Sequence, residues 1–147
     1  MHIERVRTVT PEIVTALERL VPQLTSNNRA PSSADLMDLV GSESNTLLVV
    51  REPDGKGEIV AAACLAVYRV TTGIRAVIED IVVDEECRGR GIGEALLRHL
   101  MVLAKSAGAP GVSLTSSPRR AAANRLYVRM GFSRRETNAY YYSFTSG

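Results

Sequence analysis

The chain has 147 residues, the length of one ordinary domain, of which 45% are hydrophobic and 23% charged. This balance is typical of a globular protein with a buried core, and it argues against collagen-like, disordered and disulfide-scaffold classes. Residues 1–87 carry 8 basic and 14 acidic side chains (net −6), whereas residues 88–147 carry 10 basic and 2 acidic ones (net +8). This asymmetry predicts an anionic partner for the C-terminal part of the chain.

The sequence offers little for several other classes of protein. Residues 1–5 contain no apolar segment, so we expect no secretory signal. The longest nearly uninterrupted apolar run, Ile59–Tyr68, is about half of the roughly 20 residues that span a bilayer. The cysteines and histidines are Cys64, Cys87, His2 and His99. Because these residues lack metal-ligand spacing, we expect no metal site and no disulfide framework. Together with the length and the short apolar runs, this predicts a single cytoplasmic domain over residues 1–147 without a membrane partner.

The first predicted elements are a strand and two helices. Ile3–Val9 has the residues of a short strand. Thr10-Pro11 then forms a helix start, with threonine as N-cap and proline in the first turn, and apolar residues follow at helical spacing to Leu24. The polar segment Thr25–Ser33 is predicted to be a loop, and Ser33 to about Val40 a brief helix.

The middle of the chain predicts antiparallel strands. Thr46–Glu52 and Glu58–Val70 are rich in β-branched and small apolar residues, and Pro53–Gly57 between them has strong turn chemistry. This pattern predicts a hairpin. Ile74–Asp84 is predicted to be the next strand.

The C-terminal part alternates between helix and strand. An amphipathic helix is expected from Ile92 to about Ala104, ended by Gly108. Val112–Thr115 is predicted to be a short strand, Ser117 to Met130 a helix and Asn138–Phe144 a terminal strand. Hairpins combined with strand–helix–strand units predict an α/β fold built on one mixed sheet.

One segment has the features of a phosphate-binding loop. The alternating glycines Gly89, Gly91 and Gly93 follow a strand and lead into the long helix. Glycine permits positive φ and close backbone approach, and a helix N-terminus presents unpaired N–H groups to an anion. Arg88 and Arg90 add positive charge beside these groups. The segment therefore predicts a site for a phosphate.

The kind of phosphate loop follows from its spacing. The Gly-Lys-Ser/Thr of a Walker loop is absent, and Glu94 stands where a dinucleotide fingerprint needs its third glycine. Arg88-x-x-Gly91-x-Gly93 after a strand instead resembles the pyrophosphate loop of the Gcn5-related N-acetyltransferases, the GNAT family.

A second motif supports the same resemblance. Ala123–Phe132 is similar to the family's second cofactor motif, in which an Asn and a Tyr lie on a helix that ends in Gly-Phe. Asn124 and Tyr127 are three residues apart and share one helical face. The order of predicted elements also matches the family over nearly the whole chain. The resemblance implies a mostly antiparallel sheet flanked by helices.

The resemblance implies that acetyl-CoA is the bound co-substrate. The pantetheine arm would bind the backbone of the strand before the loop, at Ile81, Val82 and Val83. The pyrophosphate would bind the loop itself, which comprises Arg88, Gly89, Arg90, Gly91, Ile92, Gly93 and Glu94. Asn124 and Tyr127 would complete the cofactor site. Arg119, Arg120 and Arg125 either approach the 3′-phosphate or form a solvated helix face.

The implied reaction is direct attack of a primary amine on the thioester. Glu79 and Asp80 are the candidate bases for the amine proton, and Tyr127 is the candidate proton donor to the thiolate. Strand alternation places Glu79 in phase with Ile81 and Val83, which favours Glu79, although a bulge in this strand would reverse that inference. An ordinary surface position is the alternative for either carboxylate.

The acceptor is less closely specified. A small-molecule amine is the main hypothesis. Ile78–Asp84 resembles the corresponding strand of glucosamine-6-phosphate N-acetyltransferases, which makes an amino-sugar phosphate one named possibility. A peptide or protein amine is the second, with Thr25–Ser33 and Tyr140–Tyr142 as walls of a groove. A non-catalytic acyl-CoA-binding module is the third.

The remaining expectations concern partners and cysteine chemistry. A nucleic-acid partner is disfavoured, because no nucleic-acid motif accompanies the arginines. The tyrosine-rich terminal segment allows a homodimer by strand exchange. Cys87 lies near a helix N-terminus but has no histidine base, so we expect it to be a bystander, and Cys64 to be a small buried side chain.

Overall fold

A computed structural model describes residues 1–24 and 29–145. The chain divides into two compact units, Met1–Thr115 and Ser116–Gly147. The first unit contains a sheet of four strands, β1 (His2–Arg5), β2 (Asn45–Glu52), β3 (Glu58–Val70) and β4 (Gly73–Val83). They pair antiparallel in the order β1-β2-β3-β4. The predicted hairpin and the strand that follows it are confirmed.

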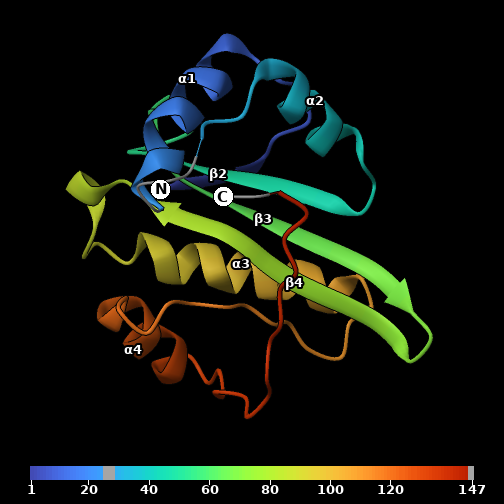
Figure 1. The fold of residues 1–147 in the computed structure, drawn as a ribbon. Helices are drawn as coiled ribbons and strands as arrows, with labels where there is room; N and C mark the ends of the chain where they lie inside the picture. The colour runs from blue at the N-terminus through green and yellow to red at the C-terminus, as the bar shows by residue number, and fades with distance from the viewer. Residues whose placement is uncertain (25–28, 146–147) are drawn as a thin grey trace. The chain divides into compact units, whose positions relative to one another are not determined.

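Helices cover both faces of this sheet (Figure 1). Those on one face are α1 (Pro11–Leu20) and α2 (Ser33–Gly41), and α3 (Ile92–Ser106) lies on the other. Two short 3₁₀ helices, η1 (Val21–Gln23) and η2 (Glu85–Cys87), extend α1 and connect β4 to the segment before α3. The predicted α/β class, a mostly antiparallel sheet flanked by helices, is confirmed.

The two N-terminal helices begin at side-chain caps. Thr10 Oγ1 accepts a hydrogen bond from the Ile13 amide at 3.3 Å, and Pro11 occupies the first turn, as predicted. Ser32 caps α2, where its hydroxyl accepts from the Asp35 amide at 3.0 Å. These caps satisfy amides that an α-helix leaves without an intrahelical partner.

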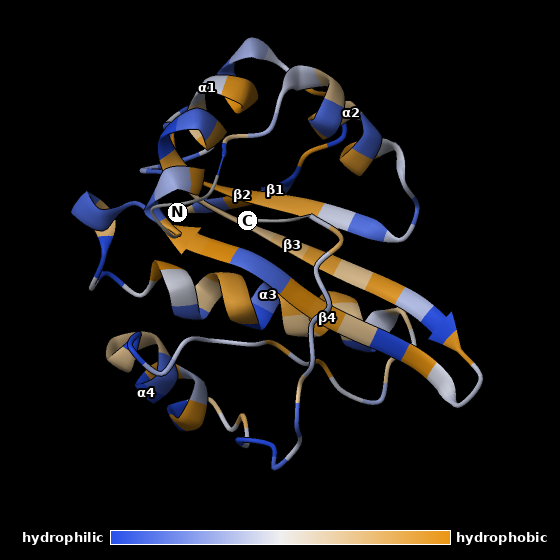
Figure 2. Ribbon diagram, viewed as in Figure 1, coloured by the Kyte–Doolittle hydropathy of each residue, from blue (hydrophilic) through white to orange (hydrophobic). Residues whose placement is uncertain are grey.

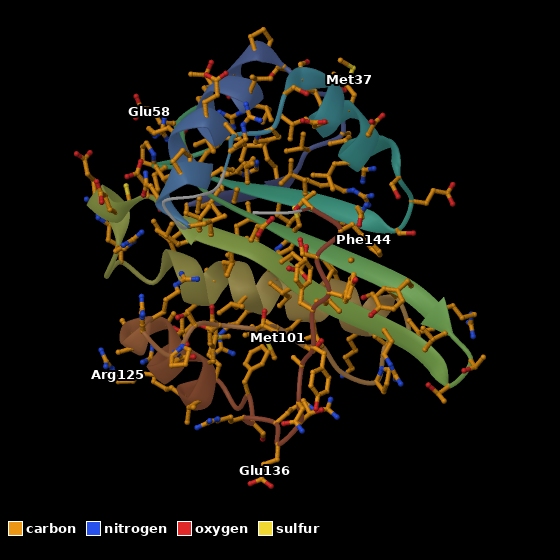
Figure 3. All side chains as sticks on the ribbon, viewed as in Figure 1. Met37, Glu58, Met101, Arg125, Glu136 and Phe144 are labelled. Carbon is orange, nitrogen blue, oxygen red and sulfur yellow. The ribbon has the colours of Figure 1, made fainter. Side chains whose placement is uncertain are left out.

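The core has one layer on each side of the sheet. The buried cluster beneath α1 and α2 includes Leu17, Leu20, Leu36, Leu47, Val49, Ala62 and Val82. The buried residues of α3 are Ile92, Leu96, Leu97, Leu100 and Ala104. Fully burying one such leucine stabilises the fold by about 1.5–3 kcal/mol. The strands between these layers carry much of the hydrophobic colour in Figure 2. The side chains of Met37 and Glu58 point outward (Figure 3).

Two predicted strands of the first unit are shorter than expected. The first ends at Arg5 rather than Val9: the ladder with β2 pairs residues 2–5, and beyond it Val6 N donates one further bond to Leu47 O at 2.9 Å. Val112–Thr115 is not a strand: a single parallel bridge joins Ser113 to Val77. The bridge consists of Ile78 N donating to Ser113 O at 2.9 Å and Ser113 N donating to Ala76 O at 3.0 Å. Two bonds fix one residue without building a ladder.

The second unit contains α4 (Ala121–Arg129) followed by irregular chain. The helix begins four residues after the predicted Ser117, whose carbonyl accepts from the Arg120 amide at 3.1 Å in a preceding turn. Asn138–Phe144 is not a strand, contrary to prediction, since β propensity forms a strand only where another strand pairs with it. Its aromatic side chains are almost fully exposed.

Among the described residues, no helix is both long enough and apolar enough to cross a bilayer.

Candidate active site

The glycine-rich segment connects the end of β4 to the start of α3. Both Gly89 and Gly91 adopt the left-handed conformation, with φ of 78° and 79°. Residues other than glycine rarely adopt this conformation, which explains Gly89 and Gly91, whereas Gly93 lies within α3. A Cβ at either position would meet no atom within 4 Å, so the space beside the backbone is open.

The amides of this loop are unusually free of protein partners. Gly91 is the N-cap of α3, and glycine has no side chain that could accept from the helix amides. After Cys87, the next backbone amide that donates to a described residue is that of Ala95, which bonds to Gly91 O at 3.1 Å. The amides of residues 88–94 thus donate to no acceptor within 1–24 and 29–145. Consecutive free amides at a helix N-terminus form an anion-binding site.

Two arginines add charge to this loop. Arg88 Nε donates to Val83 O at 3.1 Å, and an Arg90 guanidinium nitrogen donates to Glu86 O at 3.2 Å. Both side chains are therefore held by neutral carbonyls. No ion pair in the described part of the chain involves either arginine. Their charge is available to an external anion.

The strand before the loop exposes its backbone on one edge. Asp84 N donates to Val60 O at 2.8 Å, toward β3, so strand alternation turns the peptide groups of Val83 and Ile81 to the opposite edge. The Ser113 bridge covers that edge only at residues 76–78. The peptide groups of Ile81 and Val83 therefore lie on the edge of β4 that faces away from β3, where the pantetheine arm was expected. The Val83 carbonyl on this edge already accepts from Arg88 Nε.

A β-bulge separates the two candidate bases. Glu79 pairs with Cys64 and Val82 with Ala62, so two residues of β4, Asp80 and Ile81, lie opposite a single residue of β3. Asp80 has a φ of 52°, a conformation that aspartate tolerates better than most residues. The bulge places Glu79 on the face of Val82. The expected phase of Glu79 with Val83 is therefore wrong.

A cavity of about 290 Å³ lies between the sheet and the α1–α2 layer. Its apolar walls include Leu17, Val21, Leu36, Leu39, Leu47 and Val82. Arg29, Asp35 and Asp80 supply charge, and Glu79 is not among the lining residues. The sequence pattern did not predict this cavity. Its one sequence signal is the pair Ala62-Ala63, whose small side chains line the cavity beneath the helices.

Cys64 also lines this cavity, next to the acidic pair. Burial raises the pKa of the Cys64 thiol to about 12, with smaller contributions from the negative charges of Asp80 and Glu79. A thiol of this pKa is protonated at neutral pH and is a poor nucleophile. The structure thus agrees with the expectation of a small, largely buried and unreactive side chain.

Tyr127 lies on α4 in the second unit. Its ring is 6% exposed and packs edge-to-face on Phe132, with ring centroids 5.9 Å apart. Burial raises the pKa of the hydroxyl, and the positive charge of Arg120 partly opposes this. No described residue hydrogen-bonds the hydroxyl, which keeps contact with solvent. Tyr127 is therefore a protonated phenol with an available donor.

Asn124 is on the same helix, as predicted, but its side-chain amide nitrogen is already hydrogen-bonded within the protein. Its amide nitrogen donates to Ser117 O and to Arg120 O, both at 2.9 Å. These bonds fix the turn that precedes α4. Only the amide oxygen remains available to a ligand, so any cofactor contact of Asn124 is as an acceptor.

Metal coordination finds no support in the described residues, where no three side chains of His, Cys, Asp or Glu are grouped to hold an ion.

Comparison with known proteins places the chain in a family. A probable glucosamine 6-phosphate N-acetyltransferase of Oryza sativa subsp. japonica is 36% identical over 115 residues, which cover 76% of this chain and 66% of that protein. A glucosamine 6-phosphate N-acetyltransferase of Trypanosoma brucei brucei is 40% identical over 79 residues, 52% of each chain. The chain thus aligns with between half and two thirds of the length of these relatives.

The fold is shared with solved acetyltransferase structures. A crystal structure of a Trypanosoma brucei acetyltransferase superimposes with a TM-score of 0.75 at 27% identity, covering 97% of this chain and all of that one. The model of the acetyltransferase (GNAT) family matches residues 14–132, which include the glycine-rich segment and α4. The chain belongs to the GNAT acetyltransferase family.

Proposed function

We propose that the chain is an acetyl-CoA-dependent N-acetyltransferase whose acceptor is the primary amine of a small molecule, with an amino-sugar phosphate as the favoured class. The observation that carries this proposal is the row of free amides over residues 88–94, which includes two arginines without an ion-pair partner among the described residues. It offers a pyrophosphate the donors and charge that it requires. Family membership adds the acyl-transfer chemistry.

Two parts of acetyl-CoA, the pyrophosphate and the pantetheine arm, have candidate partners in this chain. The loop amides, Arg88 and Arg90 would hold the pyrophosphate, and the open edge of β4 at Ile81 and Val83 would hold the amide groups of the pantetheine arm. Bound acetyl-CoA supplies an activated thioester. The protein aligns this thioester with the acceptor, and such positioning provides much of the acceleration of a direct transfer.

Asp80 is the favoured base in this proposal. The amine must lose a proton before it attacks, and Asp80 lines the cavity at the bulge, whereas Glu79 does not. The left-handed backbone at Asp80 turns its carboxylate out of the regular strand pattern. Glu79, the residue before Asp80, is the second candidate and the one that strand alternation alone would select.

Two further groups have proposed roles. A backbone N–H at the open edge of β4, near Val83, is the proposed donor to the developing oxyanion. The Tyr127 hydroxyl is the proposed proton donor to the leaving thiolate, a role that its raised pKa permits because the phenol stays protonated at neutral pH.

The cavity supports a small acceptor. At about 290 Å³ it is at the small end of ligand pockets, and its charged residues include both a cation, Arg29, and the carboxylates Asp35 and Asp80. An amino-sugar phosphate carries both an ammonium and an anionic group. The names of the curated relatives favour the same class. A peptide or protein amine is less favoured, because the expected groove wall at Tyr140–Tyr142 is not a strand.

Two assays test the proposed function. Acetyl-CoA, but neither ATP nor NAD, should raise the Tm, and a panel of amines including glucosamine 6-phosphate should then release free thiol from acetyl-CoA. No thermal shift would contradict any role that involves coenzyme A. A shift without thiol release for any amine would favour the non-catalytic acyl-CoA-binding module.

Substitution of the base separates the two carboxylates. Asp80→Asn should lower kcat by about 10²–10⁴-fold, the usual contribution of general-base catalysis, with little change in the Kd for acetyl-CoA. Glu79→Gln is the matched control and should retain most of the activity. A larger loss in Glu79→Gln than in Asp80→Asn would reverse the assignment.

A further inference from the structure

An acidic run stands immediately before the anion-binding loop. Asp84, Glu85 and Glu86 follow β4, and the free amides begin two residues later at Arg88. Unpaired negative charge at this position would repel a bound phosphate. The conformation of this short turn also decides where the loop begins. Both the charge and the geometry of the turn therefore bear on phosphate binding.

Asp84 is the best-fixed residue of this run. Its side chain is only 14% exposed. One carboxylate oxygen accepts from the Glu86 amide at 3.2 Å and so caps η2, and the other accepts from Arg19 Nε at 3.1 Å. The backbone of Asp84 also bonds to Val60 O. The only charged partner of Asp84 within the described residues is thus Arg19, from α1.

Arg19 is itself held at two points. Besides its bond to Asp84, a terminal guanidinium nitrogen donates to Ile59 O at the start of β3. One turn further along, Gln23 Oε1 accepts from the Glu85 amide at 2.9 Å, and Gln23 Nε2 donates to Arg19 O at 3.3 Å. Residues 19 and 23 therefore bind two consecutive residues of the turn, one through charge and one through the backbone.

The same helical segment also borders the cavity. Leu17 and Val21, which alternate with Arg19 along α1 and η1, line the cavity beside Asp80. One helix end thus lines the cavity through its apolar residues and, through its polar ones, contacts the turn at Asp84 and Glu85 that precedes the loop. No sequence motif marks Arg19, because its partner Asp84 lies 65 residues away.

We propose that Arg19, supported by Gln23, is a positioning residue for acetyl-CoA binding. It neutralises Asp84 and fixes the turn from which the free amides of residues 88–94 begin. This inference rests on the proposed function of the loop. An ion pair with an exposed arginine contributes little to stability, so the effect is expected in cofactor binding rather than in unfolding.

The test compares three variants of the full chain. Arg19→Met removes the charge and both hydrogen bonds at similar side-chain length, and Arg19→Lys keeps the charge. Arg7→Met removes the same charge from an exposed position that has no hydrogen bond or ion pair with any described residue. For each protein, the Kd for acetyl-CoA, kcat and both KM values are measured well below the Tm.

Arg19→Met should raise the Kd and KM for acetyl-CoA roughly tenfold, the effect of losing one charge-assisted hydrogen bond, with kcat changed less than about twofold. Arg19→Lys should recover most of this loss, and Arg7→Met should match the unsubstituted chain. Acetyl-pantetheine, which lacks the pyrophosphate, provides a second readout. Its kcat/KM should be the same for Arg19→Met and the unsubstituted chain.

Three results would overturn the inference: unchanged acetyl-CoA affinity in Arg19→Met, an equal loss in Arg7→Met, or an equal loss with acetyl-pantetheine. The first two would exclude a specific role for Arg19, and the third would mean that it acts away from the phosphate loop. Failure of the unsubstituted chain to bind acetyl-CoA would instead contradict the proposed function itself.

Discussion

The N-termini of α2 and α3 satisfy the same physical requirement in opposite ways. At α2, Ser32 accepts from the Asp35 amide while Asp35 accepts from the Ser32 amide, both at 3.0 Å. At α3 the N-cap is Gly91, which has no side chain to do this. Glu94 occupies the position that corresponds to Asp35, but it pairs with Arg98 at 3.1 Å. Helix α2 thus supplies its own anion, the Asp35 carboxylate, whereas α3 leaves its N-terminal amides free for an external anion.

Electrostatics follow the same division. The hydrogen bonds from Ser32 lower the pKa of Asp35 below its ordinary value of 3.8, so the carboxylate stays charged at the positive end of α2. At α3 the nearby positive groups, Arg88 and Arg90, have only carbonyl partners. A capped helix N-terminus serves the fold, whereas an uncapped one beside unpaired arginines is suited to binding.

The largest expected effect comes from the two left-handed glycines. Replacing Gly89 and Gly91 together by alanine should weaken acetyl-CoA binding roughly hundredfold, because each left-handed alanine costs about 1–2 kcal/mol and the loop would relax. Titration calorimetry measures the change. Gly41→Ala at the end of α2, where a Cβ has open space and φ is not positive, is the control and should bind normally. Equal binding by both proteins would contradict the need for this loop conformation.

Removing one arginine of the loop should have a smaller effect. Arg88→Gln should raise the Kd for acetyl-CoA about tenfold and reduce its dependence on salt, since one cation beside the phosphate is lost. Arg5→Gln, at an exposed position on β1, is the matched control. A loss of affinity that does not depend on salt would argue that Arg88 acts by holding Val83 rather than by charge.

Releasing Glu94 makes α3 resemble α2. Arg98→Ala should free the Glu94 carboxylate to compete for the amides at its own helix N-terminus and weaken acetyl-CoA binding about two- to threefold. Adding Glu94→Ala should restore the affinity. If Arg98→Ala binds normally, the ion pair does not hold Glu94 away from the loop.

The smallest effect on binding is expected at α2. Ser32→Ala should lower the Tm by roughly 2–4 °C and leave acetyl-CoA affinity unchanged.

Because the pKa of Asp35 is lowered by folding, its contribution to stability is present above pH 3.8 and is lost as pH falls through the lowered value. The Tm difference between the unsubstituted chain and Asp35→Asn should therefore shrink in acid, and a constant difference would exclude the charged form as its source.

The sequence predicted those features that short segments determine. The alternation of Gly89 and Gly91 indicates positive φ, and Thr10-Pro11 indicates a helix start, because both are set by local backbone sterics. The bulge at Asp80 was not predictable, since it depends on the register between β4 and β3. Strand alternation alone therefore favoured Glu79.

Long-range features were missed for the same reason. Cys64 and Val21 line the same cavity only once the helices have packed on the sheet. Likewise, Arg19 and Asp84 form their hydrogen bond only in the folded chain. The tyrosine-rich segment has a strand-like composition but no strand partner in the described structure, so its composition predicted an element that does not form.

Amide hydrogen exchange in the unsubstituted chain tests the central claim most directly. Peptides that contain residues 88–94 should gain strong protection when acetyl-CoA binds, because those amides have no acceptor among the described residues and would acquire one. Peptides that contain residues 33–36, whose helix start is already capped, should change little. Binding of acetyl-CoA without added protection at residues 88–94 would contradict the assignment of this loop as the pyrophosphate site.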